Sequence, residues 1–536
     1  MKAEIQNIVL EQRLASLEAA REWSPQVVTE LETLIRTGDD FDLFRINPLR
    51  YSAETGTEES ETIDLFLHAA KVGLFDMDWL IVCGSCANVF NSFRKLEALD
   101  PHFTCNVCSM ENEADLDDFI QVAFTISPQV REIAFHDPAL LTAEDLYFRY
   151  HFSDDVKPLP NGRTVLDTLR SWTRLVGYLE PGEAKEVEVD MSTGVLAIID
   201  VINSTSAMFL IPPGSDHQET ELSLDVVGGR IEVDGGMLAP LRAKLPEGIS
   251  YYDDEGAAGL AESGRARPDK DPDADRDPSA RSFRFSWPAI GQLSPGPVTV
   301  SVHNGGTGRA SVLVVQFPAL PEEVGLIEFD PVLSAKRLLS TQTFRQLFRS
   351  ETVPASESLQ IRDLTYLFTD LSDSTAMYDE IGDANAYNLV RLHFDTLVTA
   401  IARNSGAVVK TIGDAIMATF VTPVDAVRAA IASLSALKDF NQTNSSKLIL
   451  KIGIHRGHSI AVSLNDQIDY FGQSVNIAAR VQQLAGPGEI VLSGDVYEMP
   501  GVASLLSSFD VAETSEIVKG VGETVGVFAV RTLDPD

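Results

Sequence analysis

The sequence predicts a multidomain protein, with a helical, zinc-ribbon-containing region first, a β-sandwich-like region next, and an α+β domain with a mixed sheet and helices at the C-terminus. Three observations lead to this prediction. Apolar residues recur at helical spacing near the N-terminus, alternate with a period of two between about 175 and 318, and form alternating strand-like and helix-like runs after residue 361. A chain of 536 residues has room for roughly three domains.

The first region, residues 1–160, is predicted to be mainly helical. Its apolar residues flank Pro25 at roughly helical spacing, which indicates two short amphipathic helices. The residues with this spacing are Leu10, Leu14, Leu17, Val27, Leu31 and Leu34.

All four cysteines lie in this region, as two C-x-x-C pairs formed by Cys83 with Cys86 and by Cys105 with Cys108. Residues 87–104, eighteen in number, separate the pairs, a spacing typical of zinc knuckles. Four thiolates on two tight turns suit tetrahedral zinc, so we expect one structural Zn²⁺ per chain. Redox disulfides and four unliganded thiols are the alternatives, and a reducing cytoplasm disfavours stable disulfides.

The second region, residues 161–325, is predicted to be a β-rich regulatory domain. Apolar residues recur with a period near two, and glycine-rich turn clusters separate such segments. The residues are Val187, Val189 and Met191, then Val298, Val300 and Val302, then Val312, Val314 and Val315. A β-sandwich or barrel fits this pattern best. Residues 253–282 are rich in Asp, Ala, Arg and Pro, which predicts a disordered loop.

The third region, residues 326–355, is predicted to be a helical linker. Its large apolar residues can share one helical face: Leu333, Leu338, Leu339, Phe344, Leu347 and Phe348. Two interpretations are open, a packed connector helix and a helix that pairs across a dimer and transmits a signal.

The last region, residues 356–536, is predicted to be an α+β domain, because strands alternate with helices and two strand pairs resemble hairpins. The segments 448–454 and 459–464 form one of these expected pairs. The other strands are expected at 364–369, 407–412, 415–420 and 489–492, and the helices near 384–404, 424–440 and 474–484.

Two aspartates in this last region follow predicted strands. Asp370 comes directly after the run 364–369, and Asp414 lies in the turn between two strands. Carboxylates from two strand ends can share a pair of divalent cations, which neutralise phosphate oxygens and activate a hydroxyl. For a lone aspartate, a helix cap or turn is the ordinary role. The chain contains no G-x-x-x-x-G-K-[ST] loop for phosphate binding.

Four separated motifs, in order, resemble the catalytic domain of class III nucleotidyl cyclases. They are LFTDLSDST at 367–375, VKTIGDAIMA at 409–418, KIGIHRG at 451–457 and DYFGQSVNIAAR at 469–480. The preceding two thirds of the chain resemble, more loosely, the paired-cysteine region of a set of soluble bacterial cyclases.

The resemblance implies that the ribose 3′-hydroxyl attacks the α-phosphate and that pyrophosphate is released. It assigns two Mg²⁺ or Mn²⁺ ions per active site to Asp370 and Asp414, together with the carbonyl group of Leu371. The turn that leads into the next helix, with Ser374 and Thr375, is expected to bind phosphates through its N–H groups.

The resemblance also assigns substrate-binding and catalytic residues. Lys410 and Asp469 match the adenine-selecting positions, and a Lys donor with an Asp acceptor complements the N1 and N6 edge of adenine. The guanylate pattern, Glu and Cys, is absent, so ATP is the expected substrate. Asn476 would position the ribose, Arg480 would neutralise charge on the α-phosphate, and Lys519 would bind the triphosphate.

The resemblance further implies a homodimer in which each active site takes residues from both protomers. We therefore expect an adenylate cyclase that makes 3′,5′-cyclic AMP and is regulated through its N-terminal region by an unidentified ligand or protein. The alternatives are a catalytically degenerate nucleotide-binding signalling protein and a cyclase that uses another NTP such as GTP.

The overall charge and hydropathy narrow the classes of partner. The formal charge is −37, from 42 basic and 79 acidic residues, which argues against a surface that docks on nucleic acid or anionic lipid. No apolar stretch approaches the roughly 18 residues of a membrane helix, and the N-terminus lacks a signal-peptide core. We expect a cytoplasmic protein without a membrane span.

Overall fold

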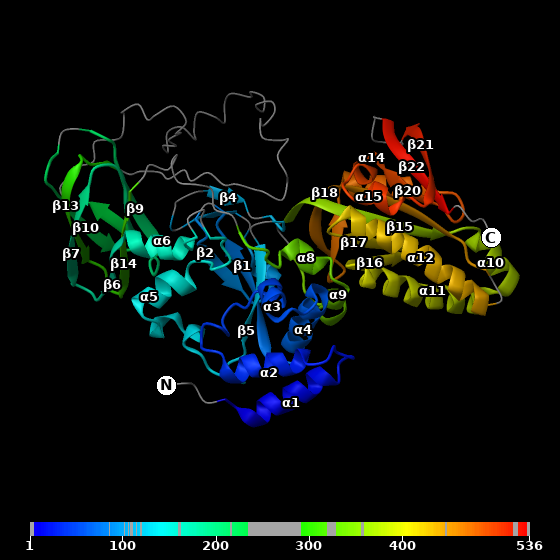
Figure 1. Ribbon diagram of the computed structural model, residues 1–536, viewed down its shortest axis with the longest axis horizontal. Helices are drawn as coiled ribbons and strands as arrows, with labels where there is room; N and C mark the ends of the chain where they lie inside the picture. Colours follow the sequence, from blue (N-terminus) through cyan, green and yellow to red (C-terminus); the bar gives the residue numbers. More distant parts are fainter. Residues whose placement is uncertain are drawn as a thin grey trace.

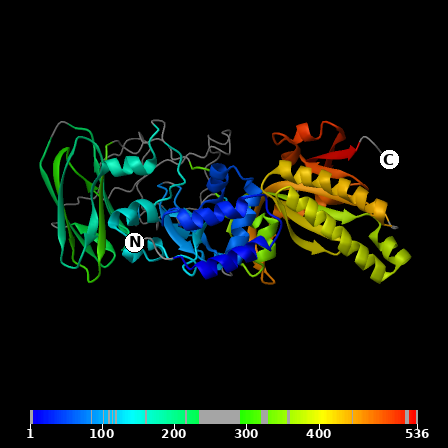
Figure 2. The ribbon, with the colours of Figure 1, turned by 60° about the horizontal axis from the view of Figure 1, so that its bottom comes forward.

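A computed structural model gives the arrangement of the chain (Figure 1). It describes residues 5–84, 86–100, 102–105, 107, 111–113, 115–117, 120–158, 162–214, 217–233, 291–318, 329–354, 359–444, 447–517 and 524–532. The β-rich part lies at one end, the N-terminal part in the middle, and the C-terminal α+β part at the other end (Figures 1 and 2).

The N-terminal part combines four helices with a three-stranded sheet. Helices α1 (Asn7–Glu18) and α2 (Val27–Thr37) confirm the two helices predicted around Pro25, and Leu10, Leu14 and Leu17 are buried. Helices α3 (Pro48–Thr55) and α4 (Glu59–Lys71) follow. The sheet has the order β2-β1-β5 and consists of β1 (Phe75–Val82), β2 (Val89–Phe93) and β5 (Ile120–Ile126).

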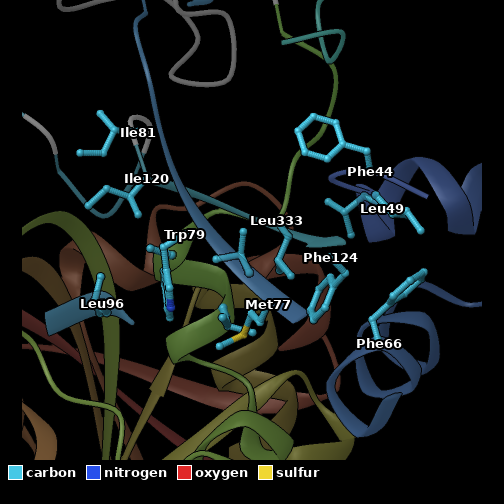
Figure 3. Packing of buried hydrophobic residues seen from close by; sticks show 14 of the residues in the cluster. Phe44, Leu49, Phe66, Met77, Trp79, Ile81, Leu96, Ile120, Phe124 and Leu333 are labelled. Carbon is cyan, nitrogen blue, oxygen red and sulfur yellow. The ribbon is translucent and has the colours of Figure 1, made fainter. Parts of the chain in front are cut away.

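This sheet corrects the prediction of a mainly helical region. Every residue of β1 except Asp76 is buried, and all of β5 is buried, so each strand contains a short apolar run without alternation, at 79–82 and 122–124. Such a run does not distinguish a buried strand from a buried helix. Met77, Trp79 and Ile81 pack together with Phe124 and Leu333 in the core of this part (Figure 3).

Short elements connect the sheet to the rest of the chain. The hairpin of β3 (His102–Thr104) and β4 (Glu111–Glu113) follows a 3₁₀ turn, η1 (Leu96–Ala98). After β5 come η2 (Ala134–His136), η3 (Pro138–Leu140), α5 (Ala143–Asp145) and the π-helical turn η4 (Leu146–Tyr150).

The β-rich part is a sandwich of two sheets, as predicted. The sheets have the orders β11-β10-β13-β7 and β12-β9-β8-β14-β6, and apolar residues of both form one core. Helix α6 (Val165–Trp172) precedes the strands, and the predicted loop 253–282 lies outside the described residues. The strands are β6 (Thr173–Leu179), β7 (Ala184–Met191), β8 (Gly194–Asp200), β9 (Thr205–Ile211), β10 (Thr220–Val227), β11 (Arg230–Val233), β12 (Gly291–Gln292), β13 (Gly296–Asn304) and β14 (Ala310–Phe317).

The linker contains two short helices rather than one helix, α8 (Ala335–Leu339) and α9 (Gln342–Leu347). The chain leaves the helical conformation at Ser340 and Thr341, where α8 ends and α9 begins. The linker packs on the N-terminal part: the Leu333 carbonyl accepts the Val122 N–H at 2.8 Å, and the Phe344 and Trp79 ring centroids are 6.1 Å apart. These contacts favour the packed-connector interpretation.

The C-terminal part is a mixed sheet covered by helices, which confirms the predicted α+β architecture. Its order is β16-β17-β15-β18-β20-β22-β21, with β19 paired to β18, and the β18–β20 pair is parallel. Its strands are β15 (Leu359–Leu371), β16 (Gly406–Ile412), β17 (Ala415–Phe420), β18 (Leu450–Leu464), β19 (Gln467–Phe471), β20 (Ile490–Ser493), β21 (Phe509–Ile517) and β22 (Thr524–Thr532). Its helices are α10 (Ser374–Ile381), α11 (Asp383–Arg403), α12 (Pro423–Thr443), α13 (Gln473–Gln483), α14 (Gly494–Tyr497) and α15 (Val502–Leu505).

The predicted hairpin between 448–454 and 459–464 is wrong, because β18 runs without interruption from Leu450 to Leu464. The turn comes later, at Asn465 and Asp466, whose φ angles are 51° and 58°. Gly457 is not a turn residue: a Cβ atom there would lie 2.4 Å from Ser474 Oγ on α13. Gly457 therefore permits a helix to approach the strand.

The N-terminal part also contacts the first strand of the C-terminal part. Leu116 donates its N–H to the Gln360 carbonyl at 3.1 Å, and the Arg362 N–H donates to Asp117 Oδ2 at 2.7 Å. Asp117 also forms an ion pair with Lys336 of α8. The short segment 115–117 thus joins the linker and β15. Across the described residues, no helix is both long and apolar enough to span a membrane.

Candidate active site

Strand pairing brings the two predicted metal aspartates to the same end of the sheet. Phe368 of β15 pairs with Met417 of β17, and Thr369 Oγ1 accepts the Ile416 N–H at 3.0 Å. Continuing this register places Asp370 opposite Ala415, next to Asp414 in the β16–β17 turn. Antiparallel neighbours on adjacent strands lie about 5 Å apart, so the backbone positions of the two aspartates are close together.

The surroundings of these carboxylates fit a divalent cation. Asp414 Oδ2 is buried, and no hydrogen-bond donor among the described residues reaches it. A buried carboxylate oxygen without a partner is costly, and a cation would satisfy it. Asp370 is half-buried, and Leu371 continues the same strand. Carboxylate and carbonyl oxygens are the ligands that Mg²⁺ and Mn²⁺ prefer.

Two residues at this site were not assigned a role from the sequence. Lys451, opposite Asp370 on β18, forms an ion pair with it, with Nζ 2.9 Å from Oδ2. His393 of α11 is fully buried, and its burial lowers the pKa of the imidazole, an effect that the charge of Asp414 opposes. Lys451 is the first residue of the motif KIGIHRG, whereas no local pattern marked His393.

The segment after Asp370 leads into a helix, as predicted. Asp373 has a φ of 54°, and α10 begins at Ser374, which is half-buried, with Thr375 exposed beside it. The Ser372 N–H donates to the Ile449 carbonyl at 2.8 Å, which fixes the turn to the chain before β18. The first N–H groups of α10 therefore start next to the carboxylates.

Lys410 and Asp469, the predicted base-selecting residues, form an ion pair. Lys410 Nζ lies 2.6 Å from Asp469 Oδ2, and the side chains are 37% and 7% exposed. Lys410 comes from β16 and Asp469 from β19, so residues 59 positions apart in sequence meet here. An amine donor and a carboxylate acceptor are thus held side by side at a partly open position.

Asn476 and Arg480 lie four residues apart on α13, as the sequence predicted for one helical face. Asn476 is exposed and Arg480 is half-buried. Helix α13 lies directly against β18, because Gly453 and Gly457 leave no side chain between helix and strand. The closest approach is at Gly453, where a Cβ atom would lie 2.1 Å from the backbone nitrogen of Gln482.

Gly453→Ala is therefore expected to destabilise the protein by about 3 kcal/mol or more, because backbone rather than a flexible side chain opposes the new methyl group. The same displacement would move Asn476 and Arg480, so activity should fall as well. Chemical denaturation measures the stability change. Gly526→Ala on β22 is the matched control, since nothing lies within 4 Å of its Cβ position. Equal stability of the two variants would contradict the close-packing account.

Three of the four predicted zinc cysteines converge. The ligand atoms of Cys83, Cys86 and Cys105 all lie within 4.8 Å of one another, and all three residues are buried. Cys86 Sγ and Cys105 Sγ are 3.6 Å apart, too far for a disulfide. Ala87, with a φ of 58°, donates its N–H to the Cys83 carbonyl and closes a tight turn around the first pair. Cys108 and Lys519 lie outside the described residues.

Comparison with known proteins identifies the family of the C-terminal part. Residues 357–529 match the family model described as the adenylate and guanylate cyclase catalytic domain. Residues 10–242 match a family of unknown function, DUF5939. The chain thus has a class III cyclase catalytic domain at its C-terminus, which confirms the resemblance, and an N-terminal region of a separate family. The family model covers adenylate and guanylate cyclases alike, and the paired-cysteine resemblance stays a prediction.

Individual relatives match over part of their length. An uncharacterized protein of Mycobacterium tuberculosis is 35% identical over 133 residues, 25% of this chain and 33% of that protein. The adenylate cyclase of Mycosarcoma maydis is 29% identical over 187 residues, 31% of this chain and 7% of that protein. The crystal structure of the adenylyl cyclase CyaB from P. aeruginosa aligns at 21% identity and a TM-score of 0.30, over 34% of this chain and 98% of that chain. This chain spans about one third of the first curated relatives that it matches.

Proposed function

We propose that the cyclase catalytic domain of this chain converts ATP to 3′,5′-cyclic AMP and pyrophosphate. The observation that carries the proposal is the Lys410–Asp469 ion pair of 2.6 Å. Adenine presents an acceptor at N1 and a donor at N6, and the pair offers the reverse, a donor and an acceptor. Guanine has the opposite polarity on that edge and would leave the nearly buried Asp469 facing an acceptor, which is unfavourable.

We propose further that the active site forms between two copies of the chain. Asp370 pairs with Lys451 near the start of β18, and Asp469 pairs with Val462 near its end. Asp370 and Asp469 of one chain thus lie toward opposite ends of a 15-residue strand, and the Lys410 side chain extends from β16 to Asp469. A two-fold dimer would bring the carboxylates of one copy to the Lys410–Asp469 pair of the other.

Exposed apolar side chains at the strand ends on both sides of the proposed site support such a dimer. Ile412 at the end of β16 is 51% exposed, Leu464 at the end of β18 is 43% exposed, and Phe471 at the end of β19 is 47% exposed. Large apolar residues exposed together are typical of protein interfaces. Burying them against a second copy would remove them from water.

Within this shared site the chain's own residues have separate tasks. Asp370, Asp414 and the Leu371 carbonyl would hold the divalent cations, which, when bound, supply a Lewis acid for the 3′-hydroxyl and the phosphate oxygens. Asn476 would orient the ribose for attack on the α-phosphate. Arg480 would stabilise the negative charge that grows on that phosphate, because a guanidinium donates two parallel hydrogen bonds. The N–H groups at the start of α10, at Ser374 and Thr375, would bind phosphate oxygens.

The direct test incubates the full-length protein with ATP or GTP, each with Mg²⁺ or Mn²⁺, and separates the products by chromatography. Cyclic AMP from ATP, in excess over cyclic GMP from GTP, is the expected result. A dimer that binds ATP without forming product would instead support a nucleotide-binding signalling protein. Preferential formation of cyclic GMP would overturn the assigned substrate.

We also propose that the cysteine cluster binds one structural Zn²⁺, with Cys108 as the fourth ligand. Three buried sulfur atoms within 4.8 Å are the donor set that zinc prefers, and the tight turn at Ala87 is the conformation that C-x-x-C sites use. Cys105 directly follows β3 of the hairpin that precedes segment 115–117, so the metal would hold the chain that contacts β15.

Zinc content provides the test. Elemental analysis of the purified protein should give one zinc per chain, and Cys105→Ser should remove it and lower Tm by roughly 5–10 °C, because the metal stabilises only the folded state. Asn91→Ala, which changes an exposed residue of strand β2, is the control and should leave the zinc content and Tm unchanged. Full zinc content in Cys105→Ser would exclude the proposed ligand set.

A further inference from the structure

Helix α9 of the linker contacts both strands that carry the base-selecting pair. It lies between α4 of the N-terminal part and β16 of the cyclase domain (Figure 1). Strands β16 and β19 are not neighbours in the sheet, because β17, β15 and β18 separate them. The two strands that carry Lys410 and Asp469 are therefore not hydrogen-bonded to each other. Strand pairing fixes their relative position only through the three strands between them.

Arg345 of α9 holds both sequence neighbours of Asp469. Its Nη1 donates to the Ile468 carbonyl at 3.1 Å, and its guanidinium lies over the Tyr470 ring, 5.3 Å from the centroid. Its Nε donates to the Leu339 carbonyl at 3.0 Å, which anchors the guanidinium to the end of α8. One side chain thus fixes the backbone before Asp469 and the ring after it.

Gln342, one helical turn earlier, makes the corresponding contact on β16. Its Oε1 accepts the Val408 N–H at 2.8 Å. The register between β16 and β17 shifts between Val408 and Lys410, as in a β-bulge. A bulge redirects the side chains that follow it, and Lys410 is the first residue after this shift. Gln342 therefore binds the irregular backbone that determines where Lys410 points.

Packing alone does not fix α9 against these strands. A hollow of about 210 Å³ remains between them, lined by residues that include Gln342, Arg345, Val408 and Ile468. Side chains that could move into this space would let the strands shift. The hydrogen bonds of Gln342 and Arg345 are the directional contacts across the hollow, and they end next to Lys410 and Asp469.

We infer that Gln342 and Arg345 are positioning residues for nucleotide selectivity, although both precede the segment that matches the cyclase family. They hold the Lys410 amine and the Asp469 carboxylate at the spacing that recognises the adenine edge. This inference rests on the proposed function, since it presumes that the pair selects the base. It also makes selectivity depend on the N-terminal part, because the Phe344 ring of α9 packs on Trp79 and Lys71 Nζ donates to the Leu347 carbonyl at 2.7 Å.

The test measures kcat/KM for ATP and for GTP with full-length Arg345→Ala and with wild type. We expect the ATP-to-GTP ratio to fall about tenfold, through a higher KM for ATP with kcat within about a factor of two. Because both substrates are measured on one preparation, an inactive or misfolded fraction cancels from the ratio. Arg345→Lys, which keeps a donor and a cation near Tyr470, should recover part of the ratio, and Gln342→Ala should lower it in the same direction.

Arg349→Ala is the matched control, because Arg349 is an exposed arginine in the same segment, and it should leave the ratio unchanged. A wild-type ratio in Arg345→Ala, with wild type itself selective for ATP, would overturn the inference and leave the proposed function standing. A wild type without ATP preference, in turnover and in competition binding of ATP against GTP, would overturn the proposed function and this inference with it.

Discussion

Asp370→Ala and Arg480→Ala are each expected to lower cyclic AMP formation by about 1,000-fold or more, and co-expression of the two variants should restore activity. The first change removes a carboxylate that would hold the cations, and the second removes the cation that would stabilise charge on the α-phosphate. If the site is shared, a mixed dimer contains one site with both residues intact and one site with neither.

The size of the recovery is itself predicted. Random pairing makes about half of the dimers mixed, and each mixed dimer has one intact site of two, so about a quarter of the wild-type activity should return. Differently tagged subunits allow the mixed dimer to be purified, and its activity per dimer should approach half of the wild-type value on the same reasoning.

A second pairing provides the control. Asp370 and Asp414 lie at the same end of the same sheet, so Asp370→Ala and Asp414→Ala disable the same half of the site. A mixed dimer of these two variants retains no intact site and should stay inactive. Recovery in this pair, or none in the Asp370–Arg480 pair despite folded dimers, would rule out an active site divided in this way.

Lys410→Glu combined with Asp469→Cys should lower the ratio of kcat/KM for ATP over GTP by about 100-fold or more. The double change replaces the donor by an acceptor and removes the acceptor carboxylate, so the adenine edge loses both complementary groups. Turnover of both substrates by the same preparation gives the ratio directly. An unchanged preference for ATP would defeat the assignment of this pair to base selection.

The single variants show why both residues are changed together. The Asp469 side chain is only 7% exposed, so Lys410→Glu alone places a second negative charge beside a nearly buried carboxylate. That variant should be less stable than the double variant, although it contains fewer substitutions. A double-mutant cycle on thermal stability should therefore give a non-zero coupling free energy between positions 410 and 469, as expected for side chains in contact.

Two separate sets of contacts connect the N-terminal part and the linker to the strands of the proposed active site. Segment 115–117 binds the start of β15, whose other end carries Asp370, while α9 binds β16 and β19 next to Lys410 and Asp469. The two halves of the proposed shared site are therefore contacted through different elements. Arg345 and Gln342 of α9 contact the strands of the base-selecting half. Segment 115–117, after the cysteine hairpin, contacts the strand that carries Asp370.

The sequence by itself determined the α+β class of the C-terminal domain and the local setting of its site residues. The predicted helices near 384–404 and 424–440 correspond to α11 and α12, and the strand predicted at 415–420 is β17. Asp370 and Asp414 lie beside turns, and Asn476 and Arg480 share a helix, as expected. These properties are local, because helical or strand periodicity and turn residues act over a few neighbouring positions.

Only the tertiary structure decided the features that depend on residues far apart in sequence. The run 75–82 became a strand because β2 and β5 pair with it, and β18 continues through Gly457 because β15 pairs with it there. Lys451 meets Asp370, and Arg345 meets Ile468, across 81 and 123 positions respectively. No local pattern encodes such pairs, since they exist only once the strands have paired and the helices have packed. The sequence therefore identified the groups that would perform the chemistry, and the fold determined what holds them in place.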